Sequence, residues 1–173
     1  MVVRRRHFRA LVACLGLAAP LCGRGADPPA VPATKENISI QKPHGWQDVP
    51  DAKVQTASRA PQLDKDQTGG FQALLTLSTE AGQIDAAGQQ GLMAQQFTGY
   101  RATDQPKGLT INGAKGVYFG GTFTHNNTPL RTRVYLFPMN NKTCIITFTC
   151  LASRWAAYQQ ELEACVSTLT LKG

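Results

Sequence analysis

The clearest pattern in the chain is an alternation of side-chain types between positions 130 and 151. Every second residue from Leu130 to Leu136 is aliphatic or small, and between them lies a basic and aromatic set, Arg131, Arg133, Tyr135 and Phe137. A Pro- and Asn-containing turn follows, and the alternation resumes with one face made of Cys144, Ile146, Phe148 and Cys150. Successive strand residues point to opposite faces, so the pattern predicts two antiparallel strands joined by a tight turn.

After these strands the apolar residues change to helical spacing. Ser153 is a candidate N-cap, and the stripe that follows it consists of Trp155, Tyr158, Leu162, Cys165 and Val166. Because the connection to the preceding strand is short, we expect this helix to fold back and bury its stripe on the sheet.

Weaker patterns of the same two kinds fill the preceding part of the chain. Strands are predicted at 37–41, 54–60, 71–79, 109–111 and 114–125. Asp85 is expected to cap a helix that runs to about residue 98. Residues 63–70 are predicted to be a solvated hairpin loop, and residues 104–107 a loop. The order predicts one α+β domain over 37–173, an antiparallel sheet flanked by helices.

The first 25 residues have the composition of a signal peptide. Arg4, Arg5, Arg6 and Arg9 provide a basic start, and the apolar stretch at 10–22 is too short to span a bilayer as a helix. We therefore predict a signal peptide at 1–25, a Pro-rich linker at 26–36 and a periplasmic or secreted mature protein without an integral membrane span. An uncleaved amphipathic start is the alternative.

The route of export stays open at this level. Arg5 and Arg6 resemble the twin-arginine signature, although Arg9 replaces the usual leucine, so an ordinary secretory signal fits as well. A lipid anchor is disfavoured, because Cys14 lacks an apolar run ahead of it and Cys22 follows the bulky Leu21.

The net charge of +7 mostly reflects the export segment. Five of the 18 Lys and Arg residues precede residue 26, which leaves 13 basic against 11 acidic residues, a net of +2. That excess is too small to argue for nucleic-acid binding, and no nucleic-acid motif is present.

Three cysteines remain after the predicted cleavage, and export would expose them to an oxidising compartment. Cys144 and Cys150 are too far apart along one strand to join, whereas a helix that folds back brings Cys165 level with Cys144. We predict a Cys144–Cys165 disulfide as a candidate, with Cys150 free. Three buried, reduced thiols are the alternative.

The order of elements resembles the PsbP-like superfamily, to which PsbP, DcrB and the Ran-binding Mog protein belong. The resemblance rests on Pro43-His44-Gly45-Trp46, the turn at 113–118, Trp155 with Tyr158, and residues 167–169. It implies an α/β/α sandwich and a role in binding other proteins. The acidic metal-binding residues of the photosynthetic members have no counterpart here, so no metal is implied.

The sequence offers no motif for catalysis, cofactor or metal binding. A phosphate loop, a nucleophile elbow and a Cys-x-x-Cys pair are all missing, and His44 and His125 are the only histidines of the mature chain. We therefore predict no enzyme activity, cofactor or metal, although a hydrolase site assembled from distant residues stays open.

The best candidate binding surface is the basic and aromatic sheet face, because Arg and Tyr are enriched where proteins meet partners. Its residues are Tyr118, Arg131, Arg133 and Tyr135, with Lys115 nearby. A solvated or helix-covered sheet face is the structural alternative. We predict an exported, non-enzymatic protein that binds or supports an envelope protein; the alternative is a periplasmic carrier that holds a small ligand between sheet and helix.

Overall fold

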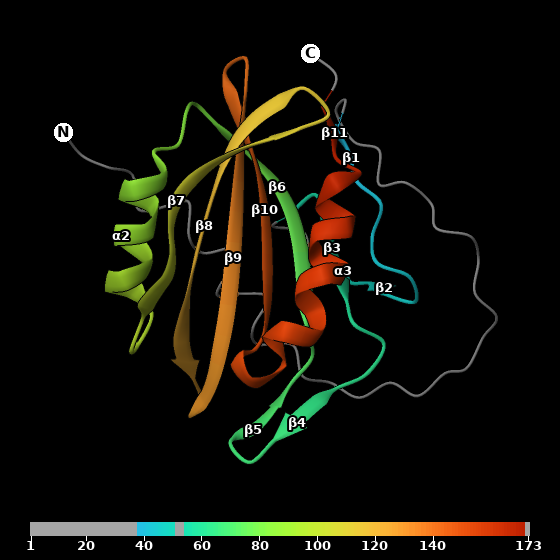
Figure 1. Cartoon of the computed structure of the whole chain (residues 1–173), viewed down its shortest axis with the longest axis vertical. Coiled ribbons are helices and arrows are strands. Elements are labelled where there is room, and N and C mark those ends of the chain that lie inside the picture. Colours follow the sequence, from blue (N-terminus) through green and yellow to red (C-terminus); the bar gives the residue numbers. More distant parts are fainter. Residues whose placement is uncertain (1–37, 51–53, 172–173) are drawn as a thin grey trace.

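The computed structural model describes residues 38–50 and 54–171 (Figure 1). The predicted signal peptide at 1–25 and linker at 26–36 lie outside these ranges.

Seven antiparallel strands form the main sheet, in the spatial order β2-β3-β6-β10-β9-β8-β7. In chain order they are β2 (Gln47–Asp48), β3 (Thr56–Arg59), β6 (Leu74–Ala81), β7 (Arg101–Ile111), β8 (Ala114–His125), β9 (Thr128–Met139) and β10 (Lys142–Leu151). Two small antiparallel pairs accompany the sheet, β1 (Ile38–Ser39) with β11 (Thr170–Leu171), and β4 (Asp64–Asp66) with β5 (Gly69–Phe71).

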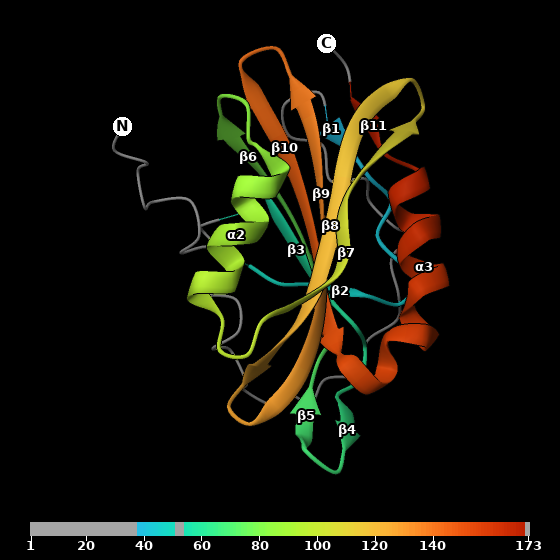
Figure 2. The same ribbon diagram turned by 60° about the vertical axis from the view of Figure 1, so that its left-hand side comes forward.

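The helices α2 (Ala86–Gln96) and α3 (Trp155–Ser167) cover opposite faces of the sheet (Figure 2). The predicted α+β fold, an antiparallel sheet flanked by helices in an α/β/α sandwich, is therefore confirmed.

The sheet face under α3 holds an aromatic core, as the apolar stripe predicted. Phe148 of β10 lies at its centre, with ring centroids 6.0 Å from Trp46, 5.9 Å from Trp155 and 5.8 Å from Tyr158. Trp46 turns inward, because Gly45 adopts a positive φ of 76° that other residues resist. Burial of these rings fixes α3 on the sheet.

The face under α2 buries a smaller, mainly aliphatic cluster. Its buried members are Met93 of α2, Phe119 of β8 and the alternating Val134 and Leu136 of β9. Asp85 caps α2 as predicted, since its carboxylate accepts from the amide of Gly88 at 2.8 Å.

The long strands pair in the register that the alternation required. Cys144 lies opposite Phe137, and Phe148 lies opposite Arg133. The turns at 112–113 and 126–127 use positive φ values of 49° at Asn112 and Asn126, a conformation that asparagine tolerates.

Two predicted loops are strands. Residues 104–107 belong to β7, which runs along the free edge of the sheet with register shifts on both sides of Asp104. An edge strand forms ladder hydrogen bonds on one side only, so it can contain proline and many polar residues. Such a sequence lacks the alternation that predicts a strand, and the strand was therefore missed. Residues 63–70 were expected to be solvated, yet they form the β4–β5 hairpin with Asp64 buried.

Ser153 does not cap α3. A 3₁₀ turn, Ala152–Arg154, precedes the helix, and the Ser153 hydroxyl donates instead to the carboxylate of Asp66. Tyr158 likewise donates to Asp64 at 2.7 Å, so the β4–β5 hairpin is fastened to the first turns of α3.

The Cys144–Cys165 disulfide is not formed. Cys144, Cys150 and Cys165 are all buried, free thiols. The Sγ of Cys165 donates to the Gln41 carbonyl at 2.9 Å, which shows that its side chain points towards the segment after β1. Burial raises the pKa of each thiol to about 12, so all three stay protonated at neutral pH.

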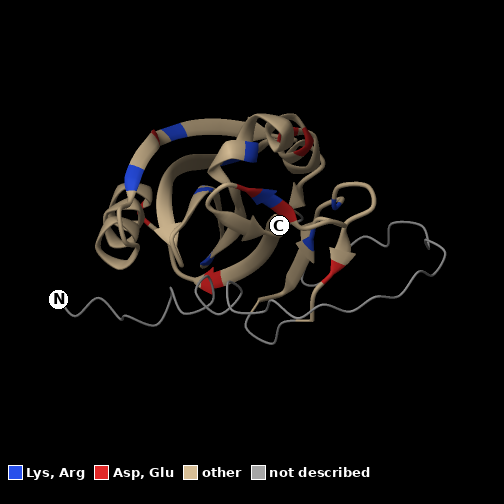
Figure 3. Ribbon diagram, turned by 90° about the horizontal axis from the view of Figure 1, so that it is seen from below, with Lys and Arg blue, Asp and Glu red and all other residues tan. Residues whose placement is uncertain are grey.

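Within the ranges 38–50 and 54–171, neither helix has the length and apolarity that a membrane span requires. Lys and Arg positions are interspersed with Asp and Glu along the ribbon (Figure 3), in keeping with the small net charge of the domain.

Candidate functional site

The structure brings the predicted surface residues together on the α3 side of the sheet. Tyr118 of β8 lies directly opposite Tyr135 of β9, and their ring centroids are 5.8 Å apart. Arg133 lies two residues before Tyr135 on the same face of β9, with its guanidinium 5.2 Å from the Tyr118 ring. Lys115 is exposed and an odd number of residues from Tyr118, so it belongs to the other face.

The helix covers much of this face. The guanidinium groups of Arg131 and Arg133 lie 4.1 Å and 4.7 Å from the ring centroid of Trp155, at the start of α3. Only 7% of Arg133 and 4% of Tyr135 are exposed. The residues predicted as an open surface therefore form a partly covered cluster held by cation–π contacts.

One carboxylate contacts both arginines. Asp104 of β7 places Oδ2 3.4 Å from Arg131 and 3.3 Å from Arg133. Gly120 lies between them, and a Cβ there would meet this oxygen at 2.9 Å and the Thr132 carbonyl at 2.6 Å. The site thus depends on a strand glycine that lets the two charges meet across β8.

Glu163 of α3 supplies the second anion. Its Oε1 lies 3.5 Å from Arg133 and also accepts from Gln159 at 2.9 Å. The Glu163 side chain is 53% exposed, so this ion pair lies at the rim of the cluster, whereas Asp104 lies deeper.

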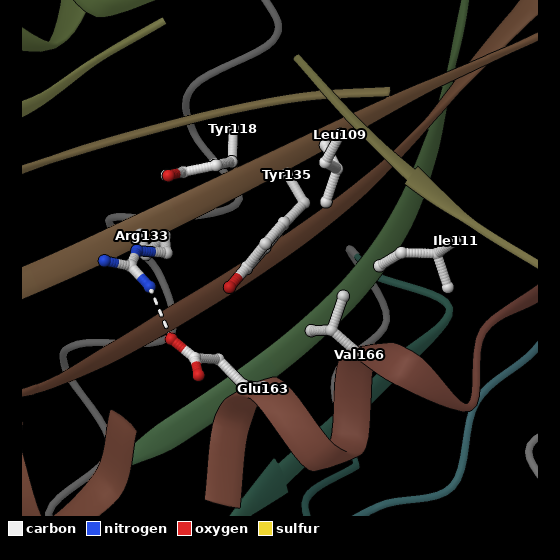
Figure 4. Close-up of a pocket in the computed structure, with 7 residues that line it drawn as sticks. All are labelled: Leu109, Ile111, Tyr118, Arg133, Tyr135, Glu163 and Val166. Carbon is white, nitrogen blue, oxygen red and sulfur yellow. Dashed lines mark ion pairs between the residues drawn. The ribbon is translucent and has the colours of Figure 1, made fainter. Parts of the chain in front are cut away.

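A cavity of about 250 Å³ opens between the sheet and α3 beside this cluster. We call it the α3 groove, and it is lined by Leu109, Ile111, Tyr118, Arg133, Tyr135, Glu163 and Val166 (Figure 4). Figure 4 shows the charged pair at one end, the three aliphatic side chains at the other and the two tyrosines along the sheet wall. The groove therefore presents a polar and an apolar end to one occupant.

The tip of the β7–β8 hairpin positions the apolar end. The Asn112 side-chain amide donates to the carbonyls of Ser167 and Leu169 at 3.0 Å and 2.9 Å. These carbonyls lie at and just beyond the end of α3, so the contact holds the hairpin against the helix. Leu109 and Ile111 thereby come to face Val166.

The surroundings of the groove shift the pKa values of Tyr135 and Arg133. Burial raises the pKa of the Tyr135 phenol above its usual value, so the hydroxyl keeps its proton. Burial opposes the charge of Arg133, but Tyr135 and Asp104 beside it offset that effect and leave its pKa above the usual range. The Nε atoms of Arg131 and Arg133 are buried and have no hydrogen-bond partner among the described residues.

The described ranges hold no group of three or more His, Cys, Asp or Glu side chains that could bind a metal ion. The arrangement in the groove is one of recognition groups: a cation, hydroxyl donors and an aliphatic wall.

Sequence reasoning placed Tyr118, Arg133 and Tyr135 correctly together but missed their partners. Asp104 fell in a predicted loop, and Glu163 lies outside the apolar stripe predicted for the helix. The glycine-rich run of β8 was the available signal, because glycine inside a strand marks a close approach of other groups.

No protein-family model and no curated protein match this sequence. Solved structures do match it. LpqN of Mycobacterium tuberculosis, involved in cell envelope biogenesis, aligns with a TM-score of 0.58 and 16% identity over 84% of this chain and 87% of that chain. PA94 of Pseudomonas aeruginosa, a putative regulator of unknown function, aligns with a TM-score of 0.57 and 18% identity over 78% and 92%.

The cyanobacterial PsbP protein CyanoP of Synechocystis aligns with a TM-score of 0.58 and 11% identity, over 89% of this chain and 100% of that chain. At these identities the likeness concerns the fold.

Proposed function

Since the chain has the PsbP-like fold that its sequence predicted, we propose that it is an exported, non-enzymatic protein that binds another protein of the cell envelope through the α3 groove. The observation that carries the proposal is the convergence of Tyr118, Arg133 and Tyr135 on an open cavity with an aliphatic end. Arginine and tyrosine are the residues that most often anchor partners, and a mixed lining suits a side chain together with its backbone.

Two further features support binding at this place. The groove adjoins β7, the edge strand of the sheet, so a partner segment can approach without displacing another strand. Its walls come from β7, β8, β9 and α3, which the Asn112 contacts hold together. A site that is formed before binding loses little ordering free energy when the partner arrives.

Site-specific photocrosslinking in intact cells tests the proposal. A photoreactive residue replaces Glu163 at the rim, and in a matched control it replaces Gln95, which is exposed on α2 across the sheet. We expect one protein adduct from position 163, absent from position 95 and reduced by Tyr118→Ser. Equal adducts from both positions, or none from position 163, would contradict the proposal.

Export is part of the proposal and has its own test. The support is the basic, then apolar composition of residues 1–25. We expect Edman sequencing of the protein from a periplasmic or secreted fraction to start near Ala26. A chain that retains Met1 and stays in the cytoplasm would contradict it.

The cavity also favours a second candidate, a carrier of a small ligand. An apolar wall with a few converging polar groups is typical of ligand sites. Native mass spectrometry of the purified protein distinguishes the two, because a carrier retains a bound mass that denaturation releases.

A further inference from the structure

We propose that the α3 groove binds the C-terminal carboxylate of a partner protein whose last residue has an aliphatic side chain. The inference rests on the proposed function and names the chemistry that the groove recognises. It follows from a buried cation, a displaceable anion and an aliphatic wall that meet in one small cavity.

The cation is Arg133, which is 7% exposed and lines the groove. Its ion pairs are long, 3.3 Å to Asp104 and 3.5 Å to Glu163, whereas charge-assisted bonds of this kind are usually about 2.7–2.9 Å. The Nη1 atom faces Glu163 in the groove, and the length of that ion pair leaves its N–H groups weakly engaged. Arg133 therefore keeps donor capacity for a further carboxylate.

Glu163 occupies the place that we assign to the carboxylate of the partner. It approaches Arg133 from the groove, as the dashed line in Figure 4 shows, and it belongs to the rim of the cavity. Its side chain is 53% exposed, so water can solvate it as soon as it leaves Arg133. An incoming carboxylate can replace it without leaving a buried charge unpaired.

The rest of the groove selects what carries the carboxylate. Leu109, Ile111 and Val166 form the end away from the ion pair (Figure 4). A chain terminus with an aliphatic side chain places one group at each end. Tyr118 and Tyr135, between the two ends, offer hydroxyl donors to the second carboxylate oxygen.

The size of the cavity suits the last residue of a chain. Its volume of about 250 Å³ lies close to the lower end of the roughly 300–1,000 Å³ range of small-molecule sites. One residue fills such a space, and the preceding residues leave past β7 at the sheet edge.

Fluorescence anisotropy of the purified domain tests the assignment. The probe is the fluorescein-labelled peptide Gly-Ser-Gly-Ser-Val-Leu with a free C-terminus, compared with the same peptide amidated. We expect the amide to bind at least about tenfold more weakly, because it removes the charge that pairs with Arg133.

Variants of the protein locate the effect. Glu163→Gln keeps the shape of the rim but removes the competing charge, and we expect it to tighten binding of the free acid by about 3- to 10-fold. Gln95→Lys on α2 changes the net charge by the same amount and should leave the affinity unchanged. Leu109→Asn should weaken binding, with an unchanged circular dichroism spectrum as the control for folding.

Three results would overturn the inference: no binding of either peptide, equal binding of acid and amide, or an affinity that Glu163→Gln leaves unchanged. None of these touches the photocrosslinking result from position 163, so the proposed function stands or fails separately. If 4-methylpentanoate displaces the peptide and binds as tightly, the groove is a small-acid site, and the assignment to a protein terminus is wrong.

Discussion

The two faces of the sheet bury their helices in different ways. Under α3, aromatic rings pack around Phe148, and two arginines lie against Trp155. Under α2, Phe119, Val134 and Leu136 surround Met93, and the buried Gln90 donates to the Asp104 carbonyl at 2.8 Å. The helix contains two glycines, Gly88 and Gly91. One face thus combines a large core with buried charge and a cavity, while the other combines a smaller apolar cluster with an uncharged polar contact.

The difference indicates where specificity lies. Apolar contacts such as those of α2 hold a helix in place without demanding particular partners. Buried charges must be paired one by one, so the α3 face fixes the positions of Asp104, Arg131 and Arg133. A recognition site needs such fixed positions, and the site that we propose lies on that face.

The largest effect that separates the faces is expected from the aromatic core. Phe148→Ala should lower the free energy of unfolding by about 3–5 kcal/mol, because it opens a cavity among Trp46, Trp155 and Tyr158. Met93→Ala under α2 should cost about 2–3 kcal/mol. Urea denaturation measures both, and equal losses would show that the two cores carry similar weight.

The buried charges give the next effect. Asp104→Asn leaves Arg131 and Arg133 without their shared anion and should cost about 1–3 kcal/mol. Asp85→Asn at the cap of α2 is the matched control and should cost only a few tenths of a kcal/mol, since asparagine also caps helices. If the Asp104→Asn variant is as stable as the Asp85→Asn variant, water must solvate the charges of Arg131 and Arg133 in place of Asp104.

The hairpin contact with α3 should have a smaller effect. Asn112→Gly retains the positive φ but removes two hydrogen bonds to the end of α3, at a cost of about 1–2 kcal/mol. Asn126→Gly at the opposite hairpin end, where the side chain contacts only its neighbour His125, should be nearly neutral. Urea denaturation of the two variants measures the losses in unfolding free energy. Equal losses would mean that the Asn112 contact with α3 does not stabilise the protein.

Replacing the glycines of α2 should increase the stability of the protein. Gly91→Ala should stabilise the protein by about 0.5–1 kcal/mol, because a Cβ there meets no atom within 4 Å and alanine favours the helix. Gly88→Ala should gain less, since its Cβ would lie 2.8 Å from the capping oxygen of Asp85. Thermal unfolding compares them, and a loss with Gly91→Ala would show that α2 needs its flexibility.

The smallest effect is local and depends on pH. Hydrogen bonds from Ser153 and Thr68 lower the pKa of Asp66 from 3.8 to about 2. A lowered folded-state pKa means that the contact contributes above about pH 4 and is lost as the pH falls towards 2. The protection of amides in the β4–β5 hairpin, relative to their intrinsic exchange rates, should fall in that window. Asp66→Asn should abolish this pH dependence of the protection, while the protection of α2 is unaffected.

Most of the fold could be predicted, because its periodicities are strong. The alternation along β9 and β10 and the stripe of α3 gave the sheet, the helix and the face on which they meet. The strand β7 was predicted only at its end, because its alternation is irregular and only Leu109 and Ile111 face the core. The hairpin predicted at 63–70 is present, but it is less solvated than expected, because Asp64 and Asp66 accept hydrogen bonds from Tyr158 and Ser153.

Only the sheet residues of the candidate site could be predicted from the sequence. Tyr118, Arg133 and Tyr135 share a strand face by sequence period alone. Their partners Asp104 and Glu163 come from an edge strand and a helix, and no local pattern connects them. The predicted thiol pair was wrong for a similar reason: helix rise brings Cys165 level with Cys144, but it does not determine the direction of the side chain.

The sequence by itself determined which side chains share a face, since that depends only on the geometry of a strand or a helix. It thereby determined the sheet, the two helices and the aromatic core. The tertiary structure decided how far α3 lies from the sheet edge, and thus whether the arginines face solvent, an anion or a cavity. Such distances result from packing between segments far apart in the chain, here the Asn112 contact and the Trp155 ring, which no local period encodes.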